Sequence, residues 1–399
     1  MATTITAGNA TNGAAISSDS TGILELKSGT GSGTTAVTVS TGQAVTFAQA
    51  ANLPNTFGFK NRIINGAMVI DQRNAGASVS PTAGSYTLDR FQCALSQASK
   101  LTVQRNAGSV TPPTGFTNYL GVTSSSAYTV LSGDYFAIQQ NIEGFNIADL
   151  GWGTANAQTV TLSFWVRSSL TGTFGGAITN RTGARSYAFT YLISVANTWE
   201  QKTITIAGDT SGTWDTNNVI GMQVQFGLGV GSTYSGSAGS WASAFYISAT
   251  GATSVVGTNG ATFYITGVQL EKGSTATSFD YRPYGTELAL CQRYYYRVYG
   301  SQTPCSGTVW STSLVLATTR FPVTMRTNPT ALEQSGTAAH YNVLAGGVVT
   351  TCNGVPTLNS AGDTFSVVAF ATGATLVTGQ GAMGNITNTS GYLGWSAEL

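Results

Sequence analysis

A two-residue alternation of apolar and polar side chains constrains the fold of this chain more than any other feature. In residues 159–167 one face of an extended segment carries only apolar side chains, which are Val160, Leu162, Phe164 and Val166. The same period recurs in residues 202–206 and 220–226, and turns rich in Gly, Ser and Asp separate these runs. Several short strands with such turns predict an antiparallel β-sandwich or jelly roll and argue against a parallel α/β sheet.

Composition favours the same fold class. Only 8% of the residues are charged, against about 25% in a typical soluble domain. The Glu, Lys and Arg that long surface helices need are therefore scarce. Polarity comes instead from Thr, Ser, Asn and Gln, and 49 Gly residues supply turns. We expect an all-β chain with an N-terminal extended anchor segment, a central jelly-roll β-sandwich and a C-terminal β-rich domain.

The first 56 residues differ from the rest of the chain. They hold only short alternating runs, at residues 22–27, 35–40 and 44–47. Short strands of this kind are unstable without partners to share a core. The segment is either a disordered tail or, as we favour, an anchor or intertwined segment that packs against other chains.

Two further domains are expected after this segment. Residues 57–285 form the predicted sandwich, and residues 286–399 form a second β-rich domain. The strand-like runs of the second domain are 313–317, 320–326, 347–351 and 365–370. At the junction, Thr286 is suited to cap a short helical turn, with Glu287 in its first turn.

Charge and cysteine usage exclude several function classes. The formal net charge is +1 without a basic stripe, which argues against nucleic-acid binding as the main task. No run of 18 apolar residues exists, so no membrane insertion is expected, and the N-terminus lacks signal-peptide features. The cysteines have neither CxxC nor metal-ligand spacing, so we expect buried free thiols, no metal and no cofactor. They are Cys93, Cys291, Cys305 and Cys352.

Residues suited to catalysis are scarce. The single histidine, His340, lies in a polar stretch and is expected to be solvated. No GxSxG, HExxH or P-loop pattern occurs. The acidic residues of the middle region form no recognisable pair of the kind that glycosidases use. We expect a non-catalytic protein, with a glycan depolymerase as the minority alternative.

Four aromatic residues are candidates for glycan binding, because sugar C–H faces stack on rings and sugar hydroxyls need polar neighbours. Trp214, Tyr234 and Trp241 lie in turns rich in Gly, Ser and Asn. Trp165 alternates with the apolar residues of its strand and so falls on the polar face. The alternative is that these rings lie in the core or at a subunit interface. Trp199, which begins a strand, is expected to be structural.

A cluster of tyrosines and arginines follows the sandwich. Its members are Arg282, Tyr284, Arg293, Tyr294, Tyr295 and Tyr296. In a chain of nearly neutral charge we interpret this cluster as a subunit interface and not as a platform for nucleic-acid bases.

Several short motifs resemble bacteriophage tail fibre and receptor-binding proteins. They are Asn61-Arg-Ile-Ile-Asn-Gly-Ala-Met68, Asp71-Gln-Arg73, Leu88-Asp-Arg-Phe91 and Gln269-Leu-Glu-Lys-Gly273. The resemblance covers roughly residues 57–330. Within it, the strands at 162–167, 199–202 and 263–270 are similar to those of jelly-roll carbohydrate-binding modules. The charged groups of the motifs, Arg62, Arg73, Asp89 and Arg90, are expected to form buried or interfacial ion pairs.

The resemblance implies a function in adhesion. It implies a homotrimer that is assembled in the host cytoplasm and docks on other virion tail proteins through residues 1–56. The distal domain would then attach the virion to a glycan or protein of the host surface. Two alternatives stay open: a virion adaptor or capsid-decorating fibre that binds only other virion proteins, and a glycan-degrading enzyme.

Overall fold

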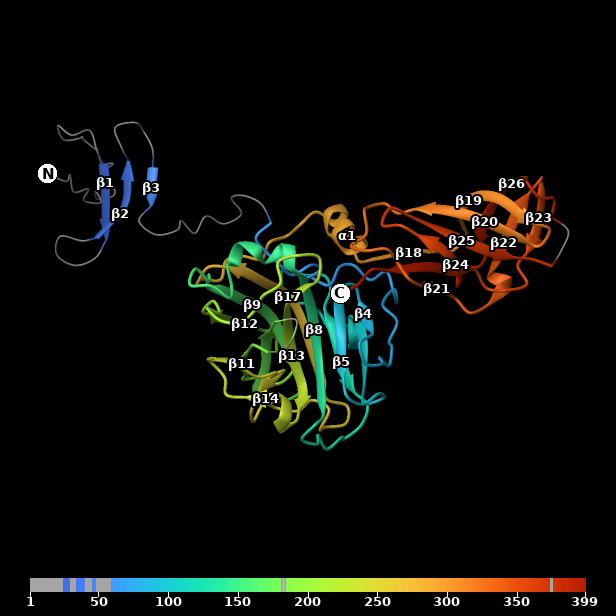
Figure 1. Cartoon of the computed structure of the whole chain (residues 1–399). Coiled ribbons are helices and arrows are strands. Elements are labelled where there is room, and N and C mark those ends of the chain that lie inside the picture. The colour runs from blue at the N-terminus through green and yellow to red at the C-terminus, as the bar shows by residue number, and fades with distance from the viewer. Residues whose placement is uncertain are drawn as a thin grey trace, which may run out of the picture. The chain divides into compact units, whose positions relative to one another are not determined.

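The computed structural model describes residues 24–28, 34–39, 45–47, 59–180, 182, 184–373 and 376–399. The chain divides into two compact units, Met1–Gly58 and Phe59–Leu399. In the first unit, β1 (Leu24–Ser28), β2 (Thr34–Val39) and β3 (Val45–Phe47) form an antiparallel sheet in that order (Figure 1). The three strands predicted in this segment are confirmed. The rest of residues 1–56 lies outside the described residues, and the predicted anchor role stays a prediction.

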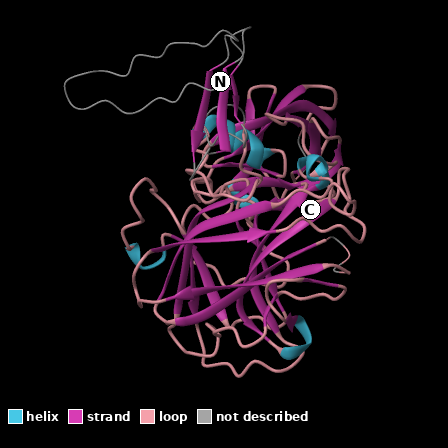
Figure 2. Ribbon diagram, turned by 90° about the vertical axis from the view of Figure 1, so that its left-hand side faces the viewer, coloured by secondary structure: helices cyan, strands magenta, loops and turns pink. Residues whose placement is uncertain are grey.

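The second unit begins with a β-sandwich of two antiparallel sheets. The five-stranded sheet has the order β12 (Glu200–Ile206), β9 (Val160–Ser168), β17 (Thr262–Lys272), β7 (Leu120–Ser124) and β6 (Leu101–Arg105). The seven-stranded sheet has the order β15 (Trp241–Ala242), β11 (Ser186–Ile193), β10 (Gly172–Thr179), β13 (Ile220–Val230), β8 (Tyr135–Glu143), β5 (Phe91–Leu95) and β4 (Tyr86–Leu88). Figure 2 shows that strands and loops make up nearly all of this unit.

The core of the sandwich confirms the predicted alternation. The four residues of the apolar face of β9 are all 0% exposed. In the register, Leu162 of β9 lies opposite Ile204 of β12 and Leu270 of β17, so apolar residues from three strands meet on one face. The inward residues of both sheets form one hydrophobic cluster, as expected for a packed sandwich.

The segment around β14 (Ser235–Gly236) and β16 (Ser248–Ala249) lies against the outer face of the seven-stranded sheet. The close approach requires glycine. A Cβ added at Gly175 or at Gly227 would stand 2.4 or 2.8 Å from the Ser248 Oγ, which no side chain tolerates without movement. This segment therefore covers part of the outer face of the seven-stranded sheet.

After the sandwich come α1 (Tyr284–Gln292) and two more sheets. A three-stranded sheet has the order β18 (Tyr295–Tyr299), β27 (Tyr392–Ser396) and β21 (Leu332–Gln334). A seven-stranded sheet has the order β23 (Val348–Thr351), β22 (Tyr341–Ala345), β26 (Gly381–Ile386), β19 (Gln302–Ser311), β20 (Leu314–Arg320), β25 (Phe365–Ala371) and β24 (Thr357–Ala361). One face of this larger sheet packs on the smaller sheet around Val343, Phe370 and Trp395, each 0% exposed.

Two local predictions for this region are wrong. Residues 321–326 form no strand; Pro322 has no N–H for a sheet, and Phe321 and Met325 instead pack into the core. Helix α1 begins after Pro283, so Thr286 lies inside the helix and does not cap it. Glu287 does lie in the first turn.

The all-β prediction is confirmed, since α1 is the single α-helix among the described residues. No described helix is long and apolar enough to cross a membrane. The division into three domains stays a prediction. The four cysteines are free and buried, as expected, and burial raises the pKa of Cys93, Cys305 and Cys352 to about 12.

The arginines of the resembling motifs form ion pairs; those of Arg73 and Arg90 with Glu398 are buried as predicted, whereas Asp149, the partner of Arg62, is 56% exposed. Arg62 pairs with Asp149 through two hydrogen bonds of 2.8 Å. Arg90, whose side chain is 1% exposed, pairs with Glu398, and Arg73 reaches Glu398 at 3.2 Å. Asp89 forms no ion pair among the described residues; it accepts hydrogen bonds from Gln72, and burial raises its pKa to about 6.

Candidate functional site

Trp214 belongs to the core of the sandwich. It is 6% exposed and meets Trp152 edge to face, with 4.6 Å between the ring centroids. Its indole N–H donates to Asp209, which also accepts two hydrogen bonds of 2.7 Å from Arg185. The faces of Trp214 are therefore not open to a sugar.

Trp241 covers this group from the outside. The ring is half-buried and lies 5.6 Å from Trp214 and 5.3 Å from Trp152, both edge to face. Its indole N–H donates to the Ala207 carbonyl at 2.8 Å. Trp241 thus covers the core residues Trp214 and Trp152, and only part of its surface contacts solvent.

The other two candidate rings are also half-buried. Tyr234 lies edge to face between Tyr135 and Phe245. Trp165 lies on the outer face of the five-stranded sheet, next to Phe116 and the bulge at Gly267, where φ is +61°. The structure brings Trp214 and Trp241 together but does not join them with Tyr234 or Trp165 in one site.

The tyrosine and arginine cluster turns mainly inward. Tyr294 and Tyr295 are each 1% exposed. Tyr294 donates to Glu143 at 2.6 Å, and Arg293 binds the same carboxylate at 2.6 Å. Tyr295 donates to Glu333 at 2.7 Å. These residues connect α1 and β18 to the sandwich and to β21 within one chain, so the two tyrosines have no surface to offer to another subunit.

The remaining members of the cluster differ in exposure. Tyr296 stacks on Trp395 with 5.8 Å between the rings. The Arg282 side chain is 3% exposed and pairs with Glu287 at 3.3 Å. Tyr284, at 63% exposed, is the member that is open to solvent. Arg293, with a side chain 33% exposed, and Tyr296 are partly open, so the interface role of these three residues stays a prediction.

His340 is half-buried and not simply solvated, which differs from the expectation. Its Nδ1 lies 2.8 Å from the Ser335 hydroxyl, and that hydroxyl also lies 2.9 Å from the Tyr341 hydroxyl. Among the described residues no carboxylate bonds the histidine ring, and no group of acidic, His and Cys side chains has metal-site geometry. The three groups fasten the turn between β21 and β22.

The most exposed aromatic ring of the described chain lies in the C-terminal sheet. Trp310 of β19 is 65% exposed. On this strand Cys305 and Val309 point into the core, whereas Ser306, Thr308 and Trp310 point outward. In this sheet β19 lies between β26 and β20 (Figure 1). The ring therefore stands on an open sheet face.

The same sheet face carries a shallow depression of about 590 Å³. It is lined by Ser306, Gly307, Leu344, Gly346, Gly347, Gly381, Ala382 and Met383. On β19 the nearest lining residue, Gly307, is three residues from Trp310, and the lining residue Gly381 of β26 pairs with Thr308. Its volume lies within the range of about 300–1,000 Å³ that ligand sites occupy.

Charge is nearly absent from this face. The seven strands of the sheet contain one charged residue, Arg320, which is the last residue of β20. Sequence analysis did not single out Trp310, because residues 302–311 were not recognised as a strand. The available signal was local: Val309 and Trp310 are adjacent, so one of two large apolar side chains must point away from the core.

The comparisons with known proteins find distant similarities among solved structures. No protein family model matches the chain, and no curated protein matches it. The enzymatically active domain of tailspike protein 4 of bacteriophage CBA120 is 12% identical over 53% of this chain, with a TM-score of 0.31. This chain spans about a fifth (21%) of that protein's length.

Carbohydrate-binding modules are also similar. A family 11 module from Clostridium thermocellum is 11% identical, covering 51% of this chain and 99% of the module, with a TM-score of 0.27. A putative sugar binding protein from Bacteroides thetaiotaomicron is 13% identical, covering 54% of this chain and 100% of that protein, with a TM-score of 0.29. Similarities at this level carry no functional conclusion.

Proposed function

We propose that this chain is a homotrimeric, non-catalytic tail fibre protein of a bacteriophage, which attaches the virion to host surface glycan through the outer face of the C-terminal sheet. The observation that carries the proposal is the 65% exposure of Trp310 on a sheet face with almost no charge. The tail fibre assignment is supported by the sequence motifs at residues 61–91 and 269–273. The virion location, the trimer and docking through residues 1–56 belong to the same proposal.

The chemistry of this face favours a neutral glycan. An indole ring stacks on the C–H face of a sugar, and Ser306 and Thr308 bring hydroxyl groups to the same side of the sheet. Gly346 and Gly347 at the rim, with φ of +56° and +81°, carry no side chains that would keep a ligand away. Because this face carries almost no charge, it does not attract an acidic polymer electrostatically.

Trp310→Ala is expected to weaken binding to host cells by about 10–100-fold, the typical effect of removing a central aromatic contact. Thermal unfolding is expected to stay nearly unchanged, because the ring is not in the core. Cell adsorption and thermal unfolding of the purified protein measure the two effects. Raising the salt concentration is expected to change binding less than about two-fold, since a neutral ligand has no ion pairs to screen.

Tyr299→Ala is the matched control. Tyr299 is 56% exposed, is also aromatic, and lies at the end of β18 in the other sheet of the C-terminal region. It is expected to leave adsorption unchanged. Equal loss in both variants, or no loss in Trp310→Ala, would show that the receptor contact lies elsewhere. Loss of oligomeric state in Trp310→Ala would assign this face to contacts between copies.

A virion structural protein that binds only other virion proteins is the second candidate. Phe59, Phe145 and Tyr284 are 60%, 59% and 63% exposed. Phe59 and Phe145 flank a pocket of about 240 Å³ that also contains Leu290 and the Arg62–Asp149 ion pair. Exposed aromatic rings around a pocket are typical of protein interfaces. If this candidate holds, Phe145→Ser is expected to lower the incorporation of the protein into virions. The adhesion proposal alone predicts that incorporation stays unchanged.

A further inference from the structure

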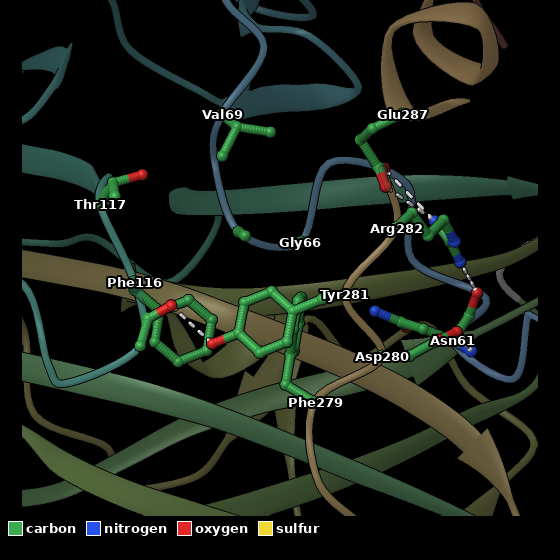
Figure 3. Close-up of a pocket in the computed structure, with 12 residues that line it drawn as sticks. Asn61, Gly66, Val69, Phe116, Thr117, Phe279, Asp280, Tyr281, Arg282 and Glu287 are labelled. Atoms are coloured by element: carbon green, nitrogen blue, oxygen red, sulfur yellow. Dashed lines mark hydrogen bonds and ion pairs between the residues drawn. The ribbon is translucent and has the colours of Figure 1, made fainter. Parts of the chain in front are cut away.

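A separate cavity of about 230 Å³ lies in the second unit (Figure 3), and no residue of the C-terminal seven-stranded sheet lines it. Its walls come from three segments that are far apart in sequence: residues 61–69, 115–117 and 279–287. None of the residues predicted from the sequence to bind glycan lines this cavity. Arg282, which was predicted to lie at a subunit interface, does line it. The cavity has two chemically different sides.

One side is a wall of three aromatic rings. Phe116, Phe279 and Tyr281 contact one another with centroid distances of 4.9, 5.1 and 5.5 Å. Tyr281 is 57% exposed, and its hydroxyl donates to the Gly115 carbonyl at 2.7 Å. Gly115 has a φ of +92°, and a Cβ there would stand 2.8 Å from the tyrosine oxygen. The ring at the mouth is therefore held in place by a contact that only glycine permits.

The opposite side is polar. Asp280 accepts the backbone N–H groups of Lys60 and Asn61 through Oδ2, at 2.9 and 3.1 Å. Its second oxygen has no hydrogen-bond partner among the described residues. Arg282 is neutralised by Glu287, to which it bonds at 3.3 Å. The pocket thus offers a fixed carboxylate with acceptor capacity and carries a formal excess of one negative charge.

We infer that this pocket binds a single neutral saccharide ring. The aromatic wall suits the C–H face of a sugar, and the carboxylate of Asp280 suits its hydroxyl donors. The volume lies below the range of about 300–1,000 Å³ of drug-sized ligands, so one ring fits and an oligosaccharide does not. The negative charge disfavours anionic sugars, and a purely apolar side chain as occupant would give the second carboxylate oxygen of Asp280 no donor.

This site shares only the class of ligand with the proposed function and does not depend on Trp310. Two weak sites on one chain, repeated in an oligomer, raise the avidity for a surface that carries many sugars. The expected affinity of the pocket for one sugar ring is a Kd on the order of 1–10 mM, because a ligand of about a dozen heavy atoms makes few contacts.

Saturation-transfer NMR of the full chain with glucose, galactose, mannose, N-acetylglucosamine and N-acetylgalactosamine tests the inference. At least one of these sugars is expected to bind, and Tyr281→Ala is expected to weaken that binding by about ten-fold or more. Tyr281→Phe keeps the ring and is expected to retain most of the binding. Ala67→Phe places a ring in the cavity and is expected to block it. Thermal unfolding confirms that each variant is folded.

Trp310→Ala is the control that separates the two sites. It is expected to leave monosaccharide binding unchanged, so a failure of the Trp310 proposal and a failure of this one are distinguishable. The inference is overturned if none of the five sugars binds, if binding survives in both Tyr281→Ala and Ala67→Phe, or if Trp310→Ala abolishes it. Preferential binding of the anionic N-acetylneuraminate would overturn the neutral ligand class.

Discussion

Glu398→Ala is expected to lower the free energy of unfolding by about 3–5 kcal/mol, the typical cost of leaving a buried charge without its partner. Glu398 pairs with Arg90, whose side chain is 1% exposed, and with Arg73. The Arg90 guanidinium also lies 3.6 Å from the centre of the Tyr294 ring, so it cannot turn to water without disturbing that ring. Denaturant unfolding of the purified protein measures the loss.

Glu200→Ala is the matched control for this change. Glu200 pairs with Lys202 at 2.6 Å, and both side chains are partly exposed, at 18% and 17%. Pairs of this kind contribute about 0–1 kcal/mol. Arg90→Met combined with Glu398→Leu removes both charges of this pair, leaves Arg73 with Glu333 as its partner, and is expected to recover much of the loss. A loss of no more than about 1 kcal/mol in Glu398→Ala would show that Arg90 reaches water in solution.

Trp214→Ala is expected to destabilise the sandwich by about 3–5 kcal/mol, the usual cost of truncating a buried Trp. The cavity would open beside Trp152 and Trp241, and Asp209 would lose the indole N–H as a donor. Adsorption of the remaining folded protein is expected to be unchanged, because the ring has no face toward solvent. Thermal unfolding and cell adsorption, measured together, separate these outcomes.

Trp310→Ala is expected to have the opposite pattern, with reduced adsorption and nearly unchanged stability. It is expected to change stability by no more than about 0.5 kcal/mol, as for other exposed positions. Unchanged stability of Trp214→Ala together with reduced adsorption would restore Trp214 as a receptor contact. It would also contradict the burial on which the assignment rests.

The fold could be predicted from the sequence where one face of a strand is buried. In β9 every second residue faces the core, so the two-residue period alone identifies the inward side chains. The same reasoning failed at residues 320–326, where apolar residues enter the core from a loop that contains Pro322. Periodicity distinguishes the two faces of a strand, but it does not report where an irregular segment packs.

The candidate sites were harder to predict, because exposure of an aromatic ring depends on segments distant in sequence. Trp214 lies in a turn rich in polar residues, yet Trp152 and Trp241 cover it. Tyr294 follows a helix, yet its hydroxyl reaches Glu143, 151 positions away. The ion pairs of Arg62 and Arg90 were expected from residue type, but their partners Asp149 and Glu398 could not be named from spacing.

Oxidative footprinting of the purified protein with host surface glycan tests the adhesion account most directly. Trp310 and Met383 lie on the proposed binding face and are 65% and 46% exposed, and both side chains oxidise readily. Bound glycan is expected to slow their oxidation, whereas Tyr299, on the other sheet, is expected to react as before. Unchanged oxidation of Trp310 and Met383 at saturating glycan would contradict the account, as would a Trp310 that is already unreactive in the free protein because another copy covers it.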